Sequence, residues 1–142
     1  MHIPAWFLSG QVMRWHAKGD FPDPVSGHSW VVAMIIITEN PDWTKDLIEV
    51  AMSHDLGERK VGDMPYDAKM AYPDLYALRE QKEIDAIGQL GFRTRDDLST
   101  KDREWLDYAD RKAACLFAAF QIWKIDFMRG VADGIEQYKP PE

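Results

Sequence analysis

The sequence predicts an all-α fold, a single helical bundle of about six helices that spans residues 1–142. Apolar residues recur at the i, i+3, i+4 spacing of one helix face, and proline and glycine divide the chain into segments of helical length. Alternating strand patterns bounded by hairpin turns are hard to find, and we see no internal repeat, linker or low-complexity tract. A single all-helical domain is therefore expected.

Turn residues and capping signals set the helix boundaries. Gly19 and the loop 21–24 end the first helix, and the turn Asn40-Pro41-Asp42 separates the central, apolar second helix from the third. Pro73 starts the long fourth helix, and Ser99 has the form of an N-cap for the fifth. The expected helices are about 5–17, 26–38, from 41 or 42 to 54, 73–90, 99–123 and 125–138, with one helical turn over 67–71. The apolar face expected on the fourth helix consists of Leu75, Leu78, Ile84, Ile87 and Leu90.

Composition excludes several classes of protein. A net charge of −7 and a pI near 5.0 argue against binding along a nucleic-acid backbone, which needs clustered Lys and Arg. The longest apolar runs are eight residues, far short of the roughly 18 that span a bilayer, and no signal peptide is visible. The single cysteine, Cys115, should be a buried thiol, which fits a reducing cytoplasm. Most of the six Trp residues should be core or pocket walls.

His54 and Asp55 follow an apolar helix face, so the chain holds an imidazole and a carboxylate against its core. Alone, such a pair is more often an ordinary helix end. Two further polar groups, His28 and Asp110, also enter apolar helices, although Asp107 is an alternative to Asp110. Two imidazoles and two carboxylates would suit a divalent metal ion with open positions for water and phosphate.

Three stretches resemble the HD-domain deoxynucleotide phosphohydrolases, which include bacterial 5′-deoxynucleotidases and short phage dATP triphosphohydrolases. They are His28-Ser29, the string His-Asp-x-x-Glu-x-x-x-Gly-Asp-x-Pro-x-x-x-Lys over 54–69, and Ala109-Asp110-Arg111. With the pair Arg14-Trp15, the resemblance covers about two-thirds of the chain. The sequence is far more specific to this family than His-Asp alone would be.

The resemblance implies that His28, His54, Asp55 and Asp110 hold the metal, because Ala-Asp-Arg is the family's form around the last ligand. The metal would be one divalent ion, Zn, Co, Mn or Mg. Only His2 and His16 remain as further histidines, so a richer two-metal cluster is not expected. Gly27 stands where relatives often have Glu, and any role of that Glu is absent.

By the same resemblance Glu58 is the acid/base residue that orients or deprotonates the attacking water. It would share a helix face with Asp55 if the helix continued through Gly57; otherwise it is a carboxylate at an exposed helix end. Asp63 would bond the substrate sugar or groups around the metal ligands, and a plain turn-capping role is nearly as good.

Substrate contacts are also implied. Arg14 matches an arginine that meets phosphate, and Trp15 a tryptophan that packs at the sugar C2′ and disfavours ribose. The alternative is that Trp15 is core and Arg14 its exposed neighbour. Lys69 matches a lysine that supports the phosphates, or else it is a solvated loop lysine.

The function expected is hydrolysis of the 5′-phosphate ester of a 2′-deoxynucleotide. A dNTP, with dATP as the family precedent, is favoured by the short chain and by cations near the motifs, namely Arg14, Arg59, Lys60, Lys69, Arg111 and Lys112. Alternatives are a dNMP 5′-deoxynucleotidase, a guanosine alarmone hydrolase, against which Arg59 argues, and a non-catalytic HD-fold assembly module. We expect no nucleic-acid or membrane partner, a homo-oligomer (dimer or higher), and a cytoplasmic location, which for a phage protein is the host cytoplasm.

Overall fold

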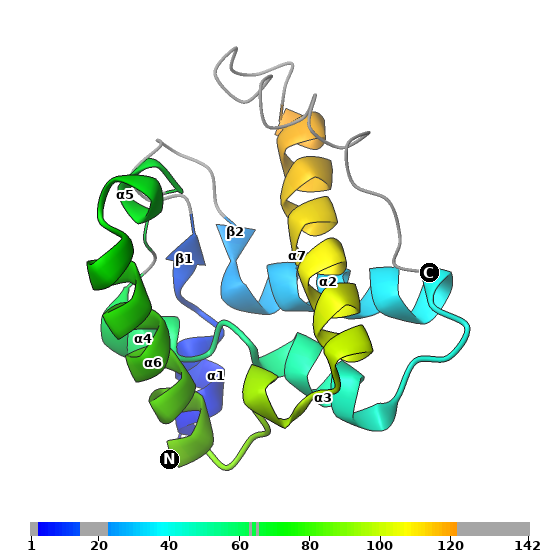
Figure 1. Cartoon of the computed structure of the whole chain (residues 1–142), viewed down its shortest axis with the longest axis horizontal. Helices are drawn as coiled ribbons and strands as arrows, with labels where there is room; N and C mark the ends of the chain where they lie inside the picture. The colour runs from blue at the N-terminus through cyan, green and yellow to red at the C-terminus, as the bar shows by residue number, and fades with distance from the viewer. Residues whose placement is uncertain (1–2, 15–22, 63, 65, 122–142) are drawn as a thin grey trace.

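The computed structural model describes residues 3–14, 23–62, 64 and 66–121. The all-α prediction is confirmed, since within these residues the helices are joined only by loops and a minimal antiparallel sheet (Figure 1). In chain order the elements are α1 (Ala5–Ser9), β1 (Met13–Arg14), β2 (Asp23–Pro24), α2 (Val25–Glu39), α3 (Lys45–Ser53), α4 (Glu58–Val61), α5 (Tyr66–Ala71), α6 (Pro73–Gln89), a 3-10 turn (Arg95–Asp97) and α7 (Thr100–Gln121). The helix expected over 125–138 lies outside the described residues.

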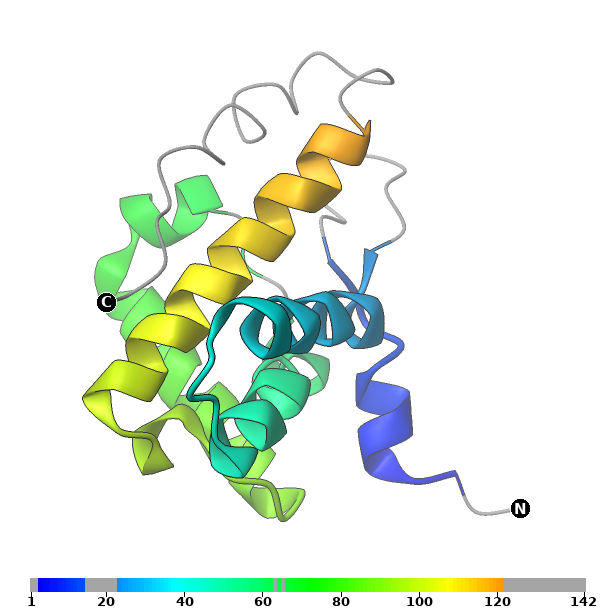
Figure 2. The same cartoon turned by 90° about the vertical axis from the view of Figure 1, so that its right-hand side faces the viewer.

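The core lies where α7 crosses α2 and where α3 packs beside them (Figures 1 and 2). Val32 and Ile36 of α2 are fully buried, as are Leu47 and Val50 of α3. The side chain of Trp105 closes the core from α7. As expected, the apolar second helix is central. Its two ends carry polar groups that meet α7, and one of these ends forms the site described below.

The two-stranded sheet corrects the prediction of one helix over 5–17. Helix α1 ends at Ser9, and the backbone after it pairs with the start of α2 instead of continuing the helix. The carbonyl oxygens of Gly10 and Val12 accept bonds from the amides of Ser26 and Val25, at 3.1 and 2.9 Å. Backbone groups bonded in this way are not available for helical bonds.

N-terminal caps explain where α3 and α7 begin. Thr44 is the N-cap of α3, its hydroxyl accepting from the amide of Leu47 at 3.1 Å, so the helix begins later than Pro41 or Asp42. The capping role predicted for Ser99 is confirmed, because its hydroxyl accepts from the amide of Asp102 at 3.1 Å.

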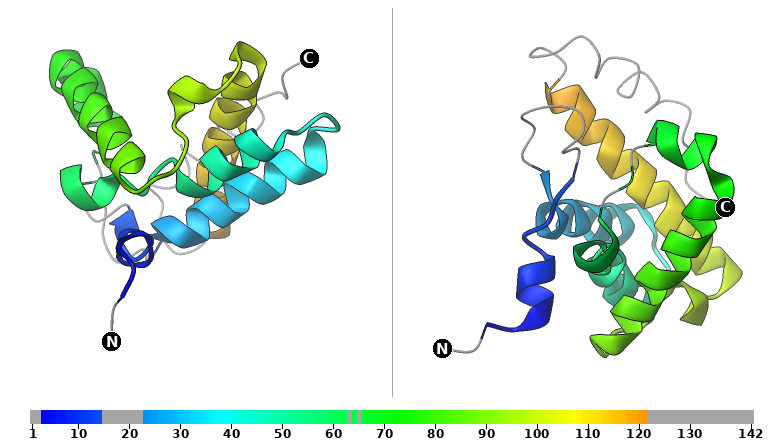
Figure 3. Two further views of the ribbon diagram at one scale, coloured as in Figure 1. Left: turned by 90° about the horizontal axis from the view of Figure 1, so that it is seen from below. Right: turned by 90° about the vertical axis from the view of Figure 1, so that its left-hand side faces the viewer.

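Helix α6 is set apart from the α2–α3–α7 core and packs on α4 (Figure 3). The contact is tight at Gly57, where an added Cβ would lie 2.5 Å from the carbonyl oxygen of Glu83. Only glycine allows this approach. The predicted apolar face of α6 is wrong in its first half, because Leu75 and Leu78 are exposed whereas Ile87 is buried.

The tryptophans divide differently from the expectation. Trp105 is buried, but Trp6, Trp30 and Trp43 are exposed, and Trp15 and Trp123 lie outside the described residues. Cys115 is buried, as expected for an inert thiol. Within the described part of the chain, no helix combines the length and the apolarity needed to cross a bilayer.

Candidate metal centre

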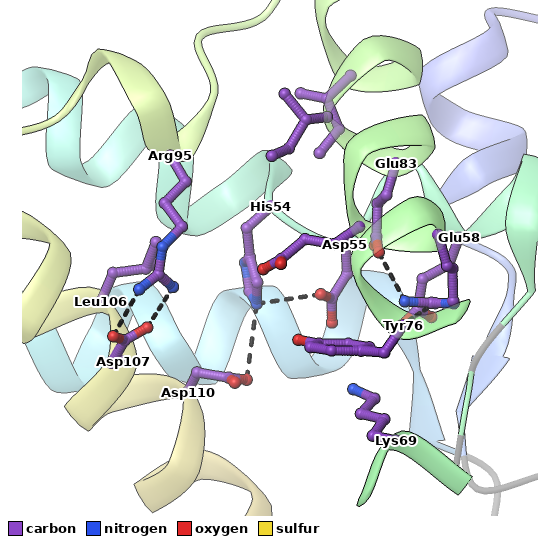
Figure 4. A pocket seen from close by; sticks show the side chains of 14 residues that line it. His54, Asp55, Glu58, Lys69, Tyr76, Glu83, Arg95, Leu106, Asp107 and Asp110 are labelled. Atoms are coloured by element: carbon purple, nitrogen blue, oxygen red, sulfur yellow. Dashed lines mark hydrogen bonds and ion pairs between the residues drawn. The ribbon is translucent and has the colours of Figure 1, made fainter. Parts of the chain in front are cut away.

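Four polar side chains converge where α2, α3 and α7 meet, and we call His28, His54, Asp55 and Asp110 the histidine cluster. His28 lies in the first turn of α2, His54 caps the end of α3, and Asp110 lies midway along α7. Nε2 of His28 lies 2.7 Å from Oδ1 of Asp110 and 3.8 Å from Oδ2 of Asp55. Nε2 of His54 lies 3.4 Å from Oδ1 of Asp55 and 3.6 Å from Oδ1 of Asp110 (Figure 4).

The ring of His54 has a fixed orientation. Its Nδ1 lies 2.8 Å from the carbonyl oxygen of Ala51, and because a carbonyl only accepts, Nδ1 carries a proton and donates it. This leaves Nε2 directed at the carboxylates, where it is buried without a hydrogen bond. A backbone partner for the other ring nitrogen is the usual support of a metal-bound histidine.

The cluster brings opposite charges together, and His28, His54 and Asp55 are largely shielded from water. Burial lowers the pKa of His54, but the carboxylates of Asp55 and Asp110 outweigh it and raise the pKa to about 9. Burial raises the pKa of Asp55, but the charges of His54 and Arg14 hold it below its ordinary value. The pKa of Asp110 is held well below its usual range, since its contacts with His28 and His54 outweigh burial.

These residues fit a divalent metal ion. The donor atoms of His28, His54 and Asp110 all lie within 4.8 Å of one another. A metal with bonds of about 2.0–2.2 Å keeps its ligand atoms about 3–3.5 Å apart, so only small adjustments are needed. Oδ2 of Asp55, like Nε2 of His54, is buried without a hydrogen bond and would gain a partner.

Asp107, the alternative ligand, has another partner. Both of its carboxylate oxygens accept from the guanidinium of Arg95, one of them at 2.6 Å. Asp110 instead contacts both histidines, with 41 % of its side chain open to solvent. The geometry therefore favours Asp110 over Asp107.

Arg14 lies beside the cluster, on β1 rather than on a helix. Its Nε is 3.6 Å from Oδ2 of Asp55, and one terminal nitrogen is 3.6 Å from Oδ2 of Asp23. Burial lowers the pKa of Arg14, but the surrounding carboxylates raise it further, so the guanidinium stays charged. The positions of Trp15 and Asp63 lie outside the described residues.

A pocket of about 140 Å³ opens on the cluster and is walled by α6 and α7 (Figure 4). Glu58 lines it and is buried, although the third helix does not continue through Gly57. Instead the amide of Glu58 bonds the carbonyl of Asp55 at 3.0 Å, and this turn keeps the two carboxylates on one side. Lys69 of α5 also lines the pocket, with its Nζ 5.3 Å from the centre of the Tyr76 ring.

Some cations expected at the pocket point elsewhere. Lys112 donates to Glu39 at the far end of α2, and Lys60 bonds Gln89. Among the described residues, the cations that line the pocket are Lys69, Arg79 and Arg95. Closeness to the motifs in the sequence therefore does not predict which cations line the pocket.

Helix α6 contributes polar residues that the sequence reasoning missed. Arg79 and Glu83 pair at 2.9 Å, and Glu83 lies within 4.8 Å of Asp55 and Glu58. Burial and then the charge of Asp55 raise the pKa of Glu83 to about 7. The sequence does contain a signal for this pair, because Arg79 and Glu83 have the i, i+4 spacing of a helical ion pair. The leucine pattern of α6 pointed instead to an apolar face, and the pair was not predicted.

A helical fold that holds two imidazoles beside two carboxylates defines a class of proteins equipped to bind a divalent metal. The family model of the HD domain matches residues 10–121, so the chain belongs to the HD-domain family. HD domains bind divalent metals and are generally metal-dependent hydrolases, often of phosphate esters. A comparison with curated proteins finds no match.

Proposed function

We propose that the protein hydrolyses the 5′-phosphate ester of 2′-deoxynucleotides, using one divalent ion held by His28, His54, Asp55 and Asp110. The observation that carries the proposal is the buried Nε2 of His54, which has no hydrogen bond although two carboxylates face it. A cation at this point would satisfy all these groups together.

The residues around the cluster suit the chemistry of ester hydrolysis. When bound, a divalent ion would supply Lewis acidity and lower the pKa of water. Glu58 lines the same pocket, and in this proposal it accepts the proton of the attacking water. Arg14, beside Asp55, would offset charge on the reacting phosphate, and Lys69 would meet phosphate oxygens from α5.

A deoxynucleoside triphosphate is the substrate that we favour, with dATP as the precedent in the resembled family, because Arg14 and Lys69 could offset the charge of its phosphates. A monophosphate is the second candidate. It is supported by one observation, since Arg79 and Arg95 of the pocket are already paired with Glu83 and Asp107. We also propose that the protein acts as a homo-oligomer, a dimer or higher.

The test is a substrate panel. The protein is incubated with Mn²⁺, Co²⁺, Zn²⁺ or Mg²⁺ and with dNTPs, dNMPs and ribonucleotides, and the products are separated by chromatography. Deoxynucleoside plus tripolyphosphate supports the favoured form, and deoxynucleoside plus orthophosphate supports the second candidate. Absence of turnover with every metal and nucleotide would contradict both.

Trp15 is proposed to exclude ribose by packing against C2′. Trp15→Ala should therefore increase the hydrolysis of ribonucleotides relative to the matching deoxynucleotides. Trp43→Ala, which changes an exposed tryptophan in the loop before α3, is the matched control. If ribonucleotides stay as poorly hydrolysed in Trp15→Ala as before, the sugar filter lies elsewhere.

A further inference from the structure

Arg79 lines the pocket and contacts Gly62, Glu83 and Glu58. Its Nε donates to the carbonyl oxygen of Gly62 at 3.0 Å, and a terminal nitrogen donates to the same oxygen. The other terminal nitrogen donates to Glu83 at 2.9 Å, and the guanidinium lies 3.9 Å from Oε1 of Glu58. Only 10 % of the Arg79 side chain is exposed. A single buried guanidinium therefore connects α6 to both ends of α4.

Helix α4 needs such support. It has four residues, from Glu58 to Val61, and a helix of one turn has no stability of its own in water. It ends at Gly62, whose φ of 77° lies in the left-handed region that favours glycine. The carbonyl that Arg79 binds is that of Gly62 itself. Arg79 thus fixes the end of the helix that begins with Glu58.

Arg79 also offsets the negative charge of nearby carboxylates. Carboxylate oxygens of Asp55, Glu58 and Glu83 lie within 4.8 Å of one another. Such crowding would push the side chains apart unless a cation lay among them. Glu83, one turn along α6, holds the guanidinium in place, and the planar fork of arginine lets it meet a carbonyl and a carboxylate together.

We propose that Arg79 is a positioning residue that holds Glu58, together with the turn at Gly62, in the place where Glu58 handles the proton of the attacking water. The proposal rests on the proposed function. It assigns to α6 the orientation of the acid/base group, whereas α2, α3 and α7 provide the metal ligands.

A double-mutant cycle with Glu58 tests the proposal. Arg79→Met keeps the aliphatic stem, removes the charge and the fork, and should lower kcat about 10- to 100-fold with little change in KM. In a Glu58→Gln background the same change should have almost no further effect, because the group it positions is gone. Radiolabelled nucleotide in single-turnover mode keeps the residual rates measurable. Arg93→Met is the matched control, since Arg93 lies on an exposed loop away from the pocket and pairs with Glu49 of α3.

Equal losses of kcat in both backgrounds would mean a general structural role and would overturn the proposal. Unchanged kcat in Arg79→Met would overturn it as well. Metal affinity, measured by titration with Mn²⁺, should stay the same in Arg79→Met because no ligand is touched; a loss of metal binding would also contradict the proposed role.

Hydrogen exchange separates this proposal from the proposed function. Arg79→Met should raise amide exchange over 58–62 and leave the α2–α7 core protected. If the wild-type protein hydrolyses no nucleotide but exchange over 58–62 still rises, the proposed function fails and the positioning contact stands. Unchanged exchange in this segment would overturn the positioning role whatever the activity.

Discussion

Two polar clusters flank the crossing of α2 and α7, and they are built on opposite principles. At the end of α2, Glu39 accepts from the hydroxyl of Tyr108 at 2.6 Å and from Nζ of Lys112 at 2.7 and 2.9 Å. Lys112 also donates to the Tyr108 hydroxyl at 3.0 Å. In this paired cluster, which consists of Glu39, Tyr108 and Lys112, the charges balance and solvent is near.

The histidine cluster lies at the start of α2. Asp110 is two residues from both Tyr108 and Lys112, so it points to the other side of α7. Here buried atoms of His54 and Asp55 are left without hydrogen bonds, and two carboxylates share two imidazoles. The protein keeps an arrangement that costs free energy unless a cation occupies it.

The comparison separates a structural cluster from a functional one. Neighbouring residues of one helix provide both, so their helical environment is nearly the same. What differs is whether the protein itself satisfies every polar atom. The predictions below test whether the two clusters behave as differently as this implies.

The largest effect is expected from the ligands. Asp110→Asn should lower kcat by more than about 100-fold, because loss of a ligand weakens both the metal and the orientation of His28. Asp107→Asn is the control one turn away, and it should retain most of the activity since Asp107 is bonded by Arg95. Steady-state kinetics of both variants and the wild type at the same excess of metal checks both. Similar losses in the two variants would favour the alternative ligand.

The pH dependence of stability comes next. In metal-free protein the pKa of His54 is raised to about 9, above its ordinary 6.5. Protonated His54 therefore contributes stability that is complete below pH 6.5 and is lost as the pH rises through 9. With a chelator present, the free energy of unfolding should fall over this window by at most about 1.4 kcal/mol per pH unit.

His54→Gln is the control for this window, because it cannot titrate there. Urea unfolding of both proteins between pH 6.5 and 9 makes the comparison. Parallel curves for wild type and His54→Gln would show that His54 does not carry the effect. The paired cluster should be silent in this range, as the pKa values of Tyr108 and Lys112 are raised above 10.0 and 10.5.

Gly57→Ala should lower the free energy of unfolding by about 1–3 kcal/mol, because its Cβ would meet the backbone of Glu83. It should also lower activity by displacing α6. Gly88→Ala is the matched control, since nothing lies within 4 Å of its Cβ and alanine is the better helix former by about 0.5–1 kcal/mol. Thermal unfolding should move in opposite directions for the two variants.

The smallest effect is expected in the paired cluster. Lys112→Met should cost about 0.2–1 kcal/mol, the range for solvent-near ion pairs, and leave kcat unchanged. Burial raises the pKa of Glu39, but its bonds with Lys112 and Tyr108 outweigh this and lower it below 4.5. The difference between wild type and Lys112→Met should therefore disappear as the pH falls below 4.5. A loss of activity in Lys112→Met would undo the division into two clusters.

The sequence could predict the helices that carry His28, His54 and Asp110, because apolar periodicity and caps are local signals. It also predicted Glu58 beside Asp55, although a turn rather than a continuous helix brings them together. The sequence did not predict the contacts between helices that are distant in the chain. The approach of α6 at Gly57 depends on tertiary packing, which no local pattern encodes.

The role of α6 shows how a local pattern can mislead. Leucine spacing predicted that Leu75 and Leu78 would face the core, yet both are exposed and the polar residues Arg79 and Glu83 face the pocket. The first half of α6 packs against a charged site instead of the apolar core. Hydrophobic periodicity assumes an apolar partner, and here that assumption fails.

Calorimetric titration of the metal-free protein with Mn²⁺ tests the central claim most directly, because it reads out the histidine cluster without any assumption about substrate. We predict saturable binding of one ion per chain in the wild type and in Lys112→Met, and none in Asp110→Asn. No saturable binding in the wild type, or binding by Asp110→Asn with wild-type affinity, would contradict the account.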